Sequence, residues 1–143
     1  MPDGLAQQKA GCVLMTTDAV GGVWRYTVDL AAGFAARGVP TVVATLGPAP
    51  DRSQRKEARL AGLELVETGL ALDWTAESPT ELAHSTARLQ SLAGARRAVS
   101  VHLHAPALAG SGRWGIPVVA VAHSCVATWW RAVRDGALPD DFR

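Results

Sequence analysis

The stretch "CVLMTTDAVGGVWRYTVDLAAGFAARGVPTVVATL", residues 12–46, decides the fold. It begins with an apolar run at 12–16 and ends with another at 40–46, and both runs are typical of short buried strands. Between them, apolar residues recur at steps of three and four, which predicts a helix that ends near Gly38. The expected apolar stripe of this helix consists of Val23, Tyr26, Thr27, Leu30, Ala31 and Phe34. A strand, a helix and a strand in this order form the unit of a parallel sheet.

The same alternation continues along the chain. A weaker strand is expected at 63–67, and two further strands at 98–104 and 117–123, where short apolar runs return. Alternation with short connections implies right-handed crossovers and helices on both faces of the sheet. The sequence therefore predicts an α/β fold, a Rossmann-like three-layer sandwich with a parallel sheet of about five strands.

Capping signals place the remaining helices. Asp51 and Gln54 stand at capping-box spacing before a basic surface helix that Gly62 ends. The next helix opens with a cap, a proline and a box-closing carboxylate, at Ser78, Pro79 and Glu81. The last helix is predicted from an apolar stripe followed by a glycine, at Val126, Trp129, Trp130, Val133 and Gly136.

Composition narrows the class of protein. The chain has 143 residues, of which 48% are hydrophobic and 19% charged, as expected for one globular domain. Residues 1–10 are polar and are expected to be a disordered tail, so the domain is predicted to cover residues 11–143. The net charge of +1 gives no reason to expect nucleic acid as a partner.

The two cysteines, the start of the chain and the apolar runs indicate in which cell compartment the protein is expected. Cys12 and Cys125 lie inside or beside apolar runs, which indicates small buried residues rather than a disulfide framework. The start of the chain has no secretory pattern, and no apolar run approaches the roughly 20 residues of a membrane span. The expected location is the cytoplasm, without a transmembrane segment.

Two adjacent glycines, Gly21 and Gly22, separate the first strand from the first helix. In an open parallel sheet, ligands bind at the carboxyl ends of the strands, and the free amides of the following helix attract anions. The pair favours a phosphate or a sugar near both glycines and the amide of Val23. The alternative is a tight turn that needs an unusual φ. The loop that carries these two glycines matches neither G-x-G-x-x-G nor G-K-[ST], which excludes a dinucleotide fingerprint and a Walker loop at this position.

Histidines mark the ends of two later strands. His102 and His104 are expected on the same face of the strand at 98–104, opposite Val101, because side chains alternate along a strand. His104 and His123 would then lie at the edge of the sheet that carries the glycines. The pattern H-x-H can bind a metal, but no acidic residue follows within "APALAGSG", so metal binding is the weaker alternative. For His84, on a helix, an ordinary surface position is expected.

Three segments together resemble the amino-terminal domain of family 4 glycosyltransferases with the GT-B fold. They are "TTDAVGGVWRYTVDLAAGFAARGVPTVVATLG", "VHLHAPALAG" and "GIPVVAVAHSCVATWWRAV", in the family's order, and the resemblance runs from about Gly11 to the end of the chain. GT-B enzymes have two Rossmann-like domains that face each other across a cleft. The resemblance implies that this domain mostly holds the acceptor, while a second domain holds the nucleotide-sugar donor.

The resemblance also implies roles for single residues. Gly21 and Gly22 match a loop that lies against the donor diphosphate and the transferred sugar, and His123 matches a catalytic histidine that faces the reacting sugar. Asp18 is expected to contact acceptor hydroxyls. The remaining expected binding residues at the edge of the cleft are Val23, His104 and Ser124. For Trp129 and Trp130, core packing is favoured over stacking on a sugar.

The family's second domain and its paired-glutamate donor motif do not occur in this sequence. The chain is therefore expected to be a truncated or split half of the enzyme that needs a separate C-terminal donor domain and is inactive alone. The implied reaction is retaining transfer of a hexosyl group from a sugar nucleotide to a hydroxyl of a carbohydrate or small-molecule acceptor, without cofactor or bound metal. Two alternatives stay open: a non-catalytic sugar- or nucleotide-binding module, and a metal-dependent hydrolase that uses His102, His104 and His123.

Overall fold

The computed structural model describes residues 11–123, 126–134 and 136–137, and within them all strands form one parallel sheet in the order β3-β2-β1-β4-β5. The expected tail at 1–10 and the candidate Ser124 lie outside the described residues. The strands are β1 (Cys12–Asp18), β2 (Thr41–Leu46), β3 (Glu64–Leu70), β4 (Ala98–Leu103) and β5 (Val118–Ala120). This arrangement confirms the predicted α/β class.

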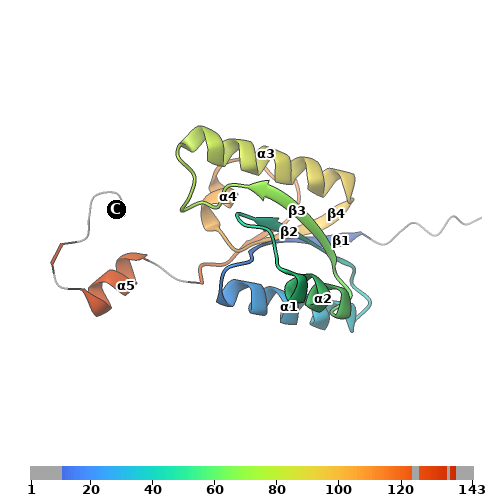
Figure 1. Cartoon of the computed structure of the whole chain (residues 1–143). Helices are drawn as coiled ribbons and strands as arrows, with labels where there is room; N and C mark the ends of the chain where they lie inside the picture. Colours follow the sequence, from blue (N-terminus) through green and yellow to red (C-terminus); the bar gives the residue numbers. More distant parts are fainter. Residues whose placement is uncertain (1–10, 124–125, 135, 138–143) are drawn as a thin grey trace, which may run out of the picture.

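Helices cover both faces of the sheet, as Figure 1 shows. On one face lie α1 (Gly22–Ala35) and α2 (Arg52–Leu60), and on the other lie α3 (Pro79–Ala95) and α4 (Pro106–Gly110). The short helix α5 (Val126–Val133) lies to the side of these layers. The three-layer sandwich is confirmed.

Strands β1 and β2 are buried along their whole length, as expected for central strands with helices on both faces. Leu14 and Val101 belong to the apolar core under α3 and α4, whereas Met15 and Val43 belong to the core over α1 and α2. The buried side of α1 differs from the predicted stripe, because it consists of Trp24, Thr27, Val28 and Ala31. Tyr26 is 42% exposed, since it faces the histidines of β4 rather than the core.

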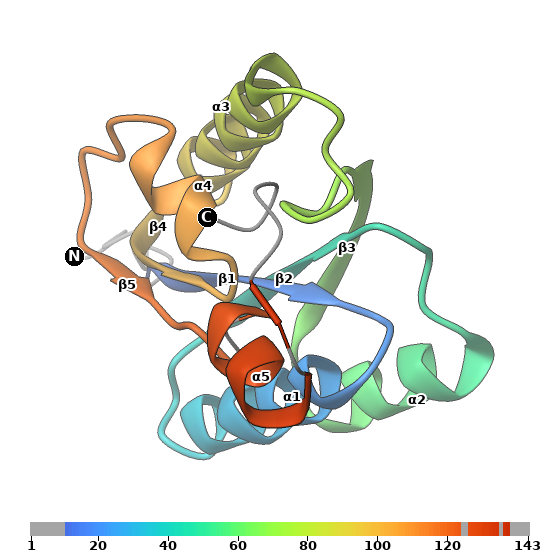
Figure 2. The ribbon, with the colours of Figure 1, turned by 90° about the vertical axis from the view of Figure 1, so that its left-hand side faces the viewer.

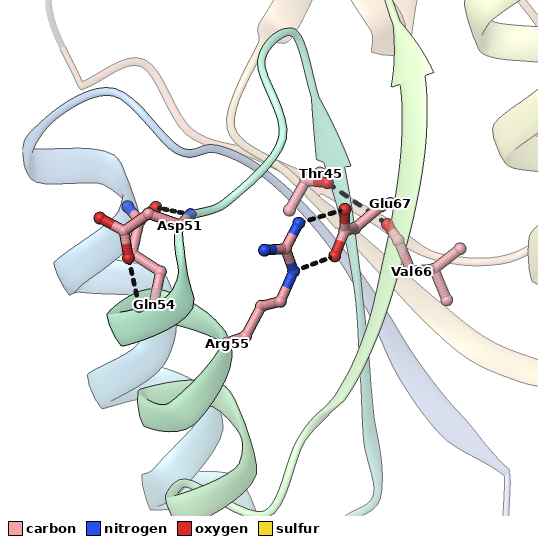
Figure 3. A network of polar contacts seen from close by, with 6 residues as sticks. All are labelled: Thr45, Asp51, Gln54, Arg55, Val66 and Glu67. Carbon is pink, nitrogen blue, oxygen red and sulfur yellow. Dashed lines mark hydrogen bonds and ion pairs between the residues drawn. The ribbon is translucent and has the colours of Figure 1, made fainter.

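The two predicted helix starts are present, with one correction. Asp51 accepts a hydrogen bond from the backbone N–H of Gln54, whose side chain accepts one from the Asp51 N–H, which completes the capping box in Figure 3. At α3, Ser78 accepts from the N–H of Glu81, but the Glu81 carboxylate accepts from Glu77 instead of Ser78. The second box was therefore predicted wrongly in its reciprocal half.

A bidentate ion pair ties α2 to the edge strand β3. Arg55 donates from Nε and Nη2 to the two carboxylate oxygens of Glu67 at 2.6 Å and 2.9 Å (Figure 3). This pair raises the pKa of Arg55 and lowers the pKa of Glu67. Both side chains are solvent-exposed, so its main effect is to fix the register of the helix on the sheet rather than to add much stability.

The last predicted strand is shorter than expected. β5 covers only Val118–Ala120, so His123 lies three residues beyond the strand instead of ending it. Val133 was expected in the apolar stripe of α5, but its side chain is 57% exposed. The side chains of residues 126–129, Trp129 among them, lie outside the described part, and Trp130 is partly buried.

The strand order places a crevice at one edge of the sheet. From β1 the chain moves to β2 and β3 along the α1 face, and then returns to β4 and β5 along the α3 face. The connections after β1 and β4 therefore leave neighbouring strands toward opposite faces, which is the point where open α/β sheets bind ligands. Figure 2 looks onto this carboxyl edge.

No helix in the described ranges is long and apolar enough to cross a membrane.

Candidate functional site

An open pocket of about 310 Å³ lies at the carboxyl edge of the sheet, where the connections after β1, β3, β4 and β5 meet. Its lining residues come from all four connections and are Val23, Asp73, Trp74, His104, Pro106, Ala122 and His123. The predicted residues Val23, His104 and His123 are thus brought together, although 100 positions separate the first from the last. Gly21 and Gly22 adjoin the pocket through their neighbour Val23.

The loop between β1 and α1 is held from both sides. Asp18 is buried, and its carboxylate accepts a hydrogen bond of 2.8 Å from the N–H of Val20, which closes a short turn. The Gln54 side-chain amide donates to the carbonyl of Ala19 at 2.9 Å. The first turn of α1 has no acidic side chain, so no side chain of that turn competes with an anion for its free amides.

The two glycines have different roles. Gly21 has φ +130° and ψ −153°, a backbone conformation that is almost restricted to glycine, as the turn interpretation predicted. Gly22 is the first residue of α1, and its φ is not positive. A Cβ at Gly22 would meet no atom within 4 Å. The space beside Gly22 is therefore open to a ligand, and only Gly21 is required by the fold.

This difference gives a matched pair of substitutions. Gly21→Val should lower the free energy of unfolding by about 1–3 kcal/mol, because valine is strained at this φ and ψ. Gly22→Val should change it by only about 0.5 kcal/mol, since the side chain enters open solvent. Denaturant melts of both variants measure this. Equal destabilisation by the two variants would contradict the assignment of the strain to Gly21.

Three histidine rings and one tyrosine ring form a cluster beside the pocket. His102 and His104 stack with ring centres 4.8 Å apart, and the centres of His104 and His123 are 4.7 Å apart. His104 Nδ1 and His123 Nε2 are 2.5 Å apart, so one ring donates a hydrogen bond to the other. Tyr26 contacts all three rings edge-on. The expected shared face of His102 and His104 is confirmed, and His84 is an exposed residue of α3 as expected.

Burial disfavours the charged forms of two rings of this cluster, His102 and His104. Burial, followed by the charges of His102 and His123, lowers the pKa of His104 to about 3. Burial also lowers the pKa of His102, and His123 adds to that effect. The N–H of His104 donates to the Thr16 hydroxyl at 3.0 Å, which fixes the end of β4 beside β1. The His104 ring therefore acts at neutral pH as an uncharged polar surface.

The depressed pKa of His104 predicts a pH dependence of stability. Unfolded His104 takes up a proton near pH 6.5, whereas folded His104 resists it until about pH 3. Its contribution is therefore complete above pH 6.5 and is lost as the pH falls toward 3. The slope should stay below the one-proton limit of about 1.4 kcal/mol per pH unit, because the ring is partly exposed. Melts of His104→Gln should lose this slope relative to the parent, while His84→Gln should keep it.

The arrangement gives little support to a metal site. Within the described ranges, no three His, Cys, Asp or Glu side chains are placed to hold a metal ion together. His102 and His104 do lie beside His123, as the hydrolase alternative requires. The rings of His102 and His104 stack instead of converging, and a hydrogen bond joins the rings of His104 and His123.

Asp73 and Trp74 were missed by the sequence analysis. They follow Leu72 in the loop between β3 and α3, and Leu72 is buried against Gly47 at the end of β2. Thr75 hydrogen-bonds the N–H and carbonyl of Leu72 and fixes the turn. The available signal was their place after a strand, because this edge of a parallel sheet gathers ligand-binding residues.

The carboxyl group of Asp73 is held in an unusual setting. Its Oδ1 atom is buried, and it has no hydrogen-bond partner among the described residues. Burial raises its pKa, and the negative charge of Asp18 adds to this, while the amides of Trp74 and Asp73 act in the opposite direction. Beside the pocket, Asp18, Asp73 and His104 also line a space of about 10 Å³, roughly the size of one water molecule.

Comparison of the fold places the chain in a structural class. A glycosyltransferase from Rickettsia africae ESF-5 superposes with a TM-score of 0.58 at 14% identity, covering 87% of this chain and 34% of that chain. The glycotransferase of kitacinnamycin superposes with a TM-score of 0.56 at 20% identity, covering 78% of this chain and 30% of that chain. The chain thus has the Rossmann-like fold of a GT-B glycosyltransferase domain and spans about a third of the length of each structure.

A comparison of the sequence with family models assigns the family. The model of Glycosyltransferase Family 4 matches residues 20–139, so the chain belongs to this family, as its resemblance indicated. A search of the curated proteins found no match. The match begins at the glycine loop and includes every connection that lines the pocket.

Proposed function

We propose that this chain forms the acceptor-side half of a retaining glycosyltransferase, which moves a hexosyl group from a nucleotide sugar to an acceptor hydroxyl. The observation that carries the proposal is the pocket in which the start of α1, the hydrogen-bonded pair His104 and His123, and an exposed tryptophan meet. A two-substrate transfer needs an anion site and a sugar-binding surface next to each other, and this pocket combines both kinds of group.

Most of the predicted residues that the structure describes have a role in this proposal. The open start of α1 at Gly22 and Val23 would receive the donor diphosphate, because its amides are free and no side chain blocks the approach. Gly21 would hold this loop in shape. His123, exposed at the pocket and hydrogen-bonded to His104, would face the sugar as its leaving group departs. Asp18 would shape the loop through Val20 and extend the polar edge.

The experiment uses the chain joined to a donor-binding domain of a family 4 enzyme. Incubation with a panel of nucleotide sugars and acceptors should give a product in which the sugar keeps the anomeric configuration it had in the donor, as read by NMR. An inverted product would overturn the retaining mechanism. No transfer from a chimera that folds and binds nucleotide would overturn the transferase proposal and favour a binding module.

A further inference from the structure

Trp74 exposes a large aromatic ring at the edge of the pocket. Its side chain is 65% exposed, although the loop that carries it is anchored by Leu72 and Thr75. Exposure of a tryptophan forgoes the free energy that burial of its ring would give. A fixed, exposed ring beside polar groups offers a flat apolar surface with hydrogen-bonding partners next to it. This combination suits the apolar face and the hydroxyl edge of a sugar ring.

The charges at the pocket restrict what can bind there. Among the described residues that line it, Asp73 is the only one with a formal charge at neutral pH besides the titratable histidines, and no lysine or arginine is present. His104 is neutral because its pKa is about 3. Asp18 adds a second carboxyl group behind Asp73. An anionic group near Trp74 would therefore meet negative charge without a compensating cation.

We propose that the Trp74 side of the pocket binds an acceptor sugar ring that carries no anionic group. The ring stacks on Trp74, and its hydroxyl or amine donors face Asp73, which lines the pocket and whose Oδ1 has no hydrogen-bond partner among the described residues. The term acceptor rests on the proposed function. The binding of the ring to Trp74 and Asp73 does not depend on it.

The same charges separate two binding regions within one pocket. Val23, at the amino end of α1, lies on the side where free amides favour an anion. Asp73 and Trp74 lie on the β3–α3 loop, where the Asp73 carboxyl group disfavours one. An anionic donor and a non-anionic acceptor are thus sorted by electrostatics to different ends of the pocket.

Three probes test the proposal on the 143-residue chain: methyl glucoside, glucosamine and glucose 6-phosphate. Binding is measured by ligand-observed NMR titration at low salt. Methyl glucoside and glucosamine should bind saturably, and glucose 6-phosphate should bind more weakly by about fivefold or more. Trp74→Ala should weaken methyl glucoside binding by about tenfold, whereas Trp74→Phe should stay within about threefold because it keeps a stacking ring.

Charge is tested by one variant with a matched control. Asp73→Asn should remove most of the discrimination against glucose 6-phosphate and should weaken glucosamine more than methyl glucoside. Asp29→Asn changes an exposed carboxylate of α1 that pairs with Arg25, so it should leave all three affinities unchanged. Thermal melts of each variant identify any loss of folding, which is not expected at Trp74 because its ring is exposed.

Several results would overturn the proposal: no saturable binding of any probe, tightest binding of the phosphorylated sugar, or unchanged affinity in the folded Trp74→Ala variant. Failure of the proposed function gives a different outcome. Sugar binding that depends on Trp74, together with a chimera that transfers no sugar, would leave this inference intact and reject the enzyme. Transfer by the chimera with an acceptor KM that Trp74→Ala leaves unchanged would support the enzyme and reject this inference.

Discussion

The 143-residue chain alone should give no sugar transfer above the blank, with any nucleotide sugar and acceptor. Its pocket lies at one edge of a single sheet, and the chain spans about a third of the two glycosyltransferase structures it resembles. Fixing two reactants in one geometry is worth about 7–11 kcal/mol, which corresponds to roughly 10⁵-fold to 10⁸-fold in rate. In the proposed function this chain would contact the donor only at its diphosphate, so a donor domain would be needed to fix the rest of the nucleotide sugar against the acceptor.

The measurement is product formation by mass spectrometry over long incubations, with the chimera of this chain and a donor domain as the positive control. A second control mixes the chain with the separate donor domain, which tests whether the two halves act without a covalent link. Turnover by the chain alone, proportional to its concentration and abolished by His123→Ala, would contradict the prediction.

In a two-domain enzyme that carries this chain, His123→Ala should lower kcat by about 30-fold to 1000-fold and change KM little. That range corresponds to about 2–4 kcal/mol, the effect of removing one well-aimed polar group from a developing charge. His123 lies exposed at the pocket, and its Nε2 is 2.5 Å from His104 Nδ1. An interaction that strengthens as the sugar becomes positively charged lowers the barrier without tightening ground-state binding.

The competing interpretation is that His123 only holds His104 in place. In that case His123→Ala would lower the melting temperature and leave kcat within about threefold of the parent, well under 1 kcal/mol. His123→Gln separates the two effects, because glutamine can keep a hydrogen bond to His104 but presents no imidazole to the sugar. Low kcat with a normal melting temperature in both variants would support a catalytic role. His84→Ala, exposed on α3, serves as the control.

Strand and helix positions were predictable wherever local chemistry decides them. An apolar run or a helix cap depends only on residues a few positions away in the sequence. The structure confirms the runs at β1 and β2 and the caps Asp51 and Ser78. The Glu81 error arose because two backbone amides, at Glu77 and Ser78, compete for one carboxylate. Sequence spacing does not decide which of them is closer.

The site was predictable only in part because it depends on tertiary neighbours. Val23 was predicted at this edge because it follows the glycine pair at the start of a helix, and His104 because it ends a predicted strand, since parallel strands end at one edge. Tyr26 was expected in the core because its spacing along the helix fits the apolar stripe. In the structure its ring packs edge-on against His104, outside the core. Asp73 and Trp74 follow a weak strand, and only the folded loop brings them to His104.

The loop between β3 and α3 is secured at both ends. It leaves β3 at Leu70, is anchored by buried Leu72, and ends at the Ser78 cap of the next helix. Trp74 is 65% exposed between these anchors and does not belong to either apolar core of the described residues. Sugar preference could therefore diversify in evolution, or be altered in the laboratory, by exchanging residues 73 and 74 while Leu72, Thr75 and the Ser78 cap keep the loop in place.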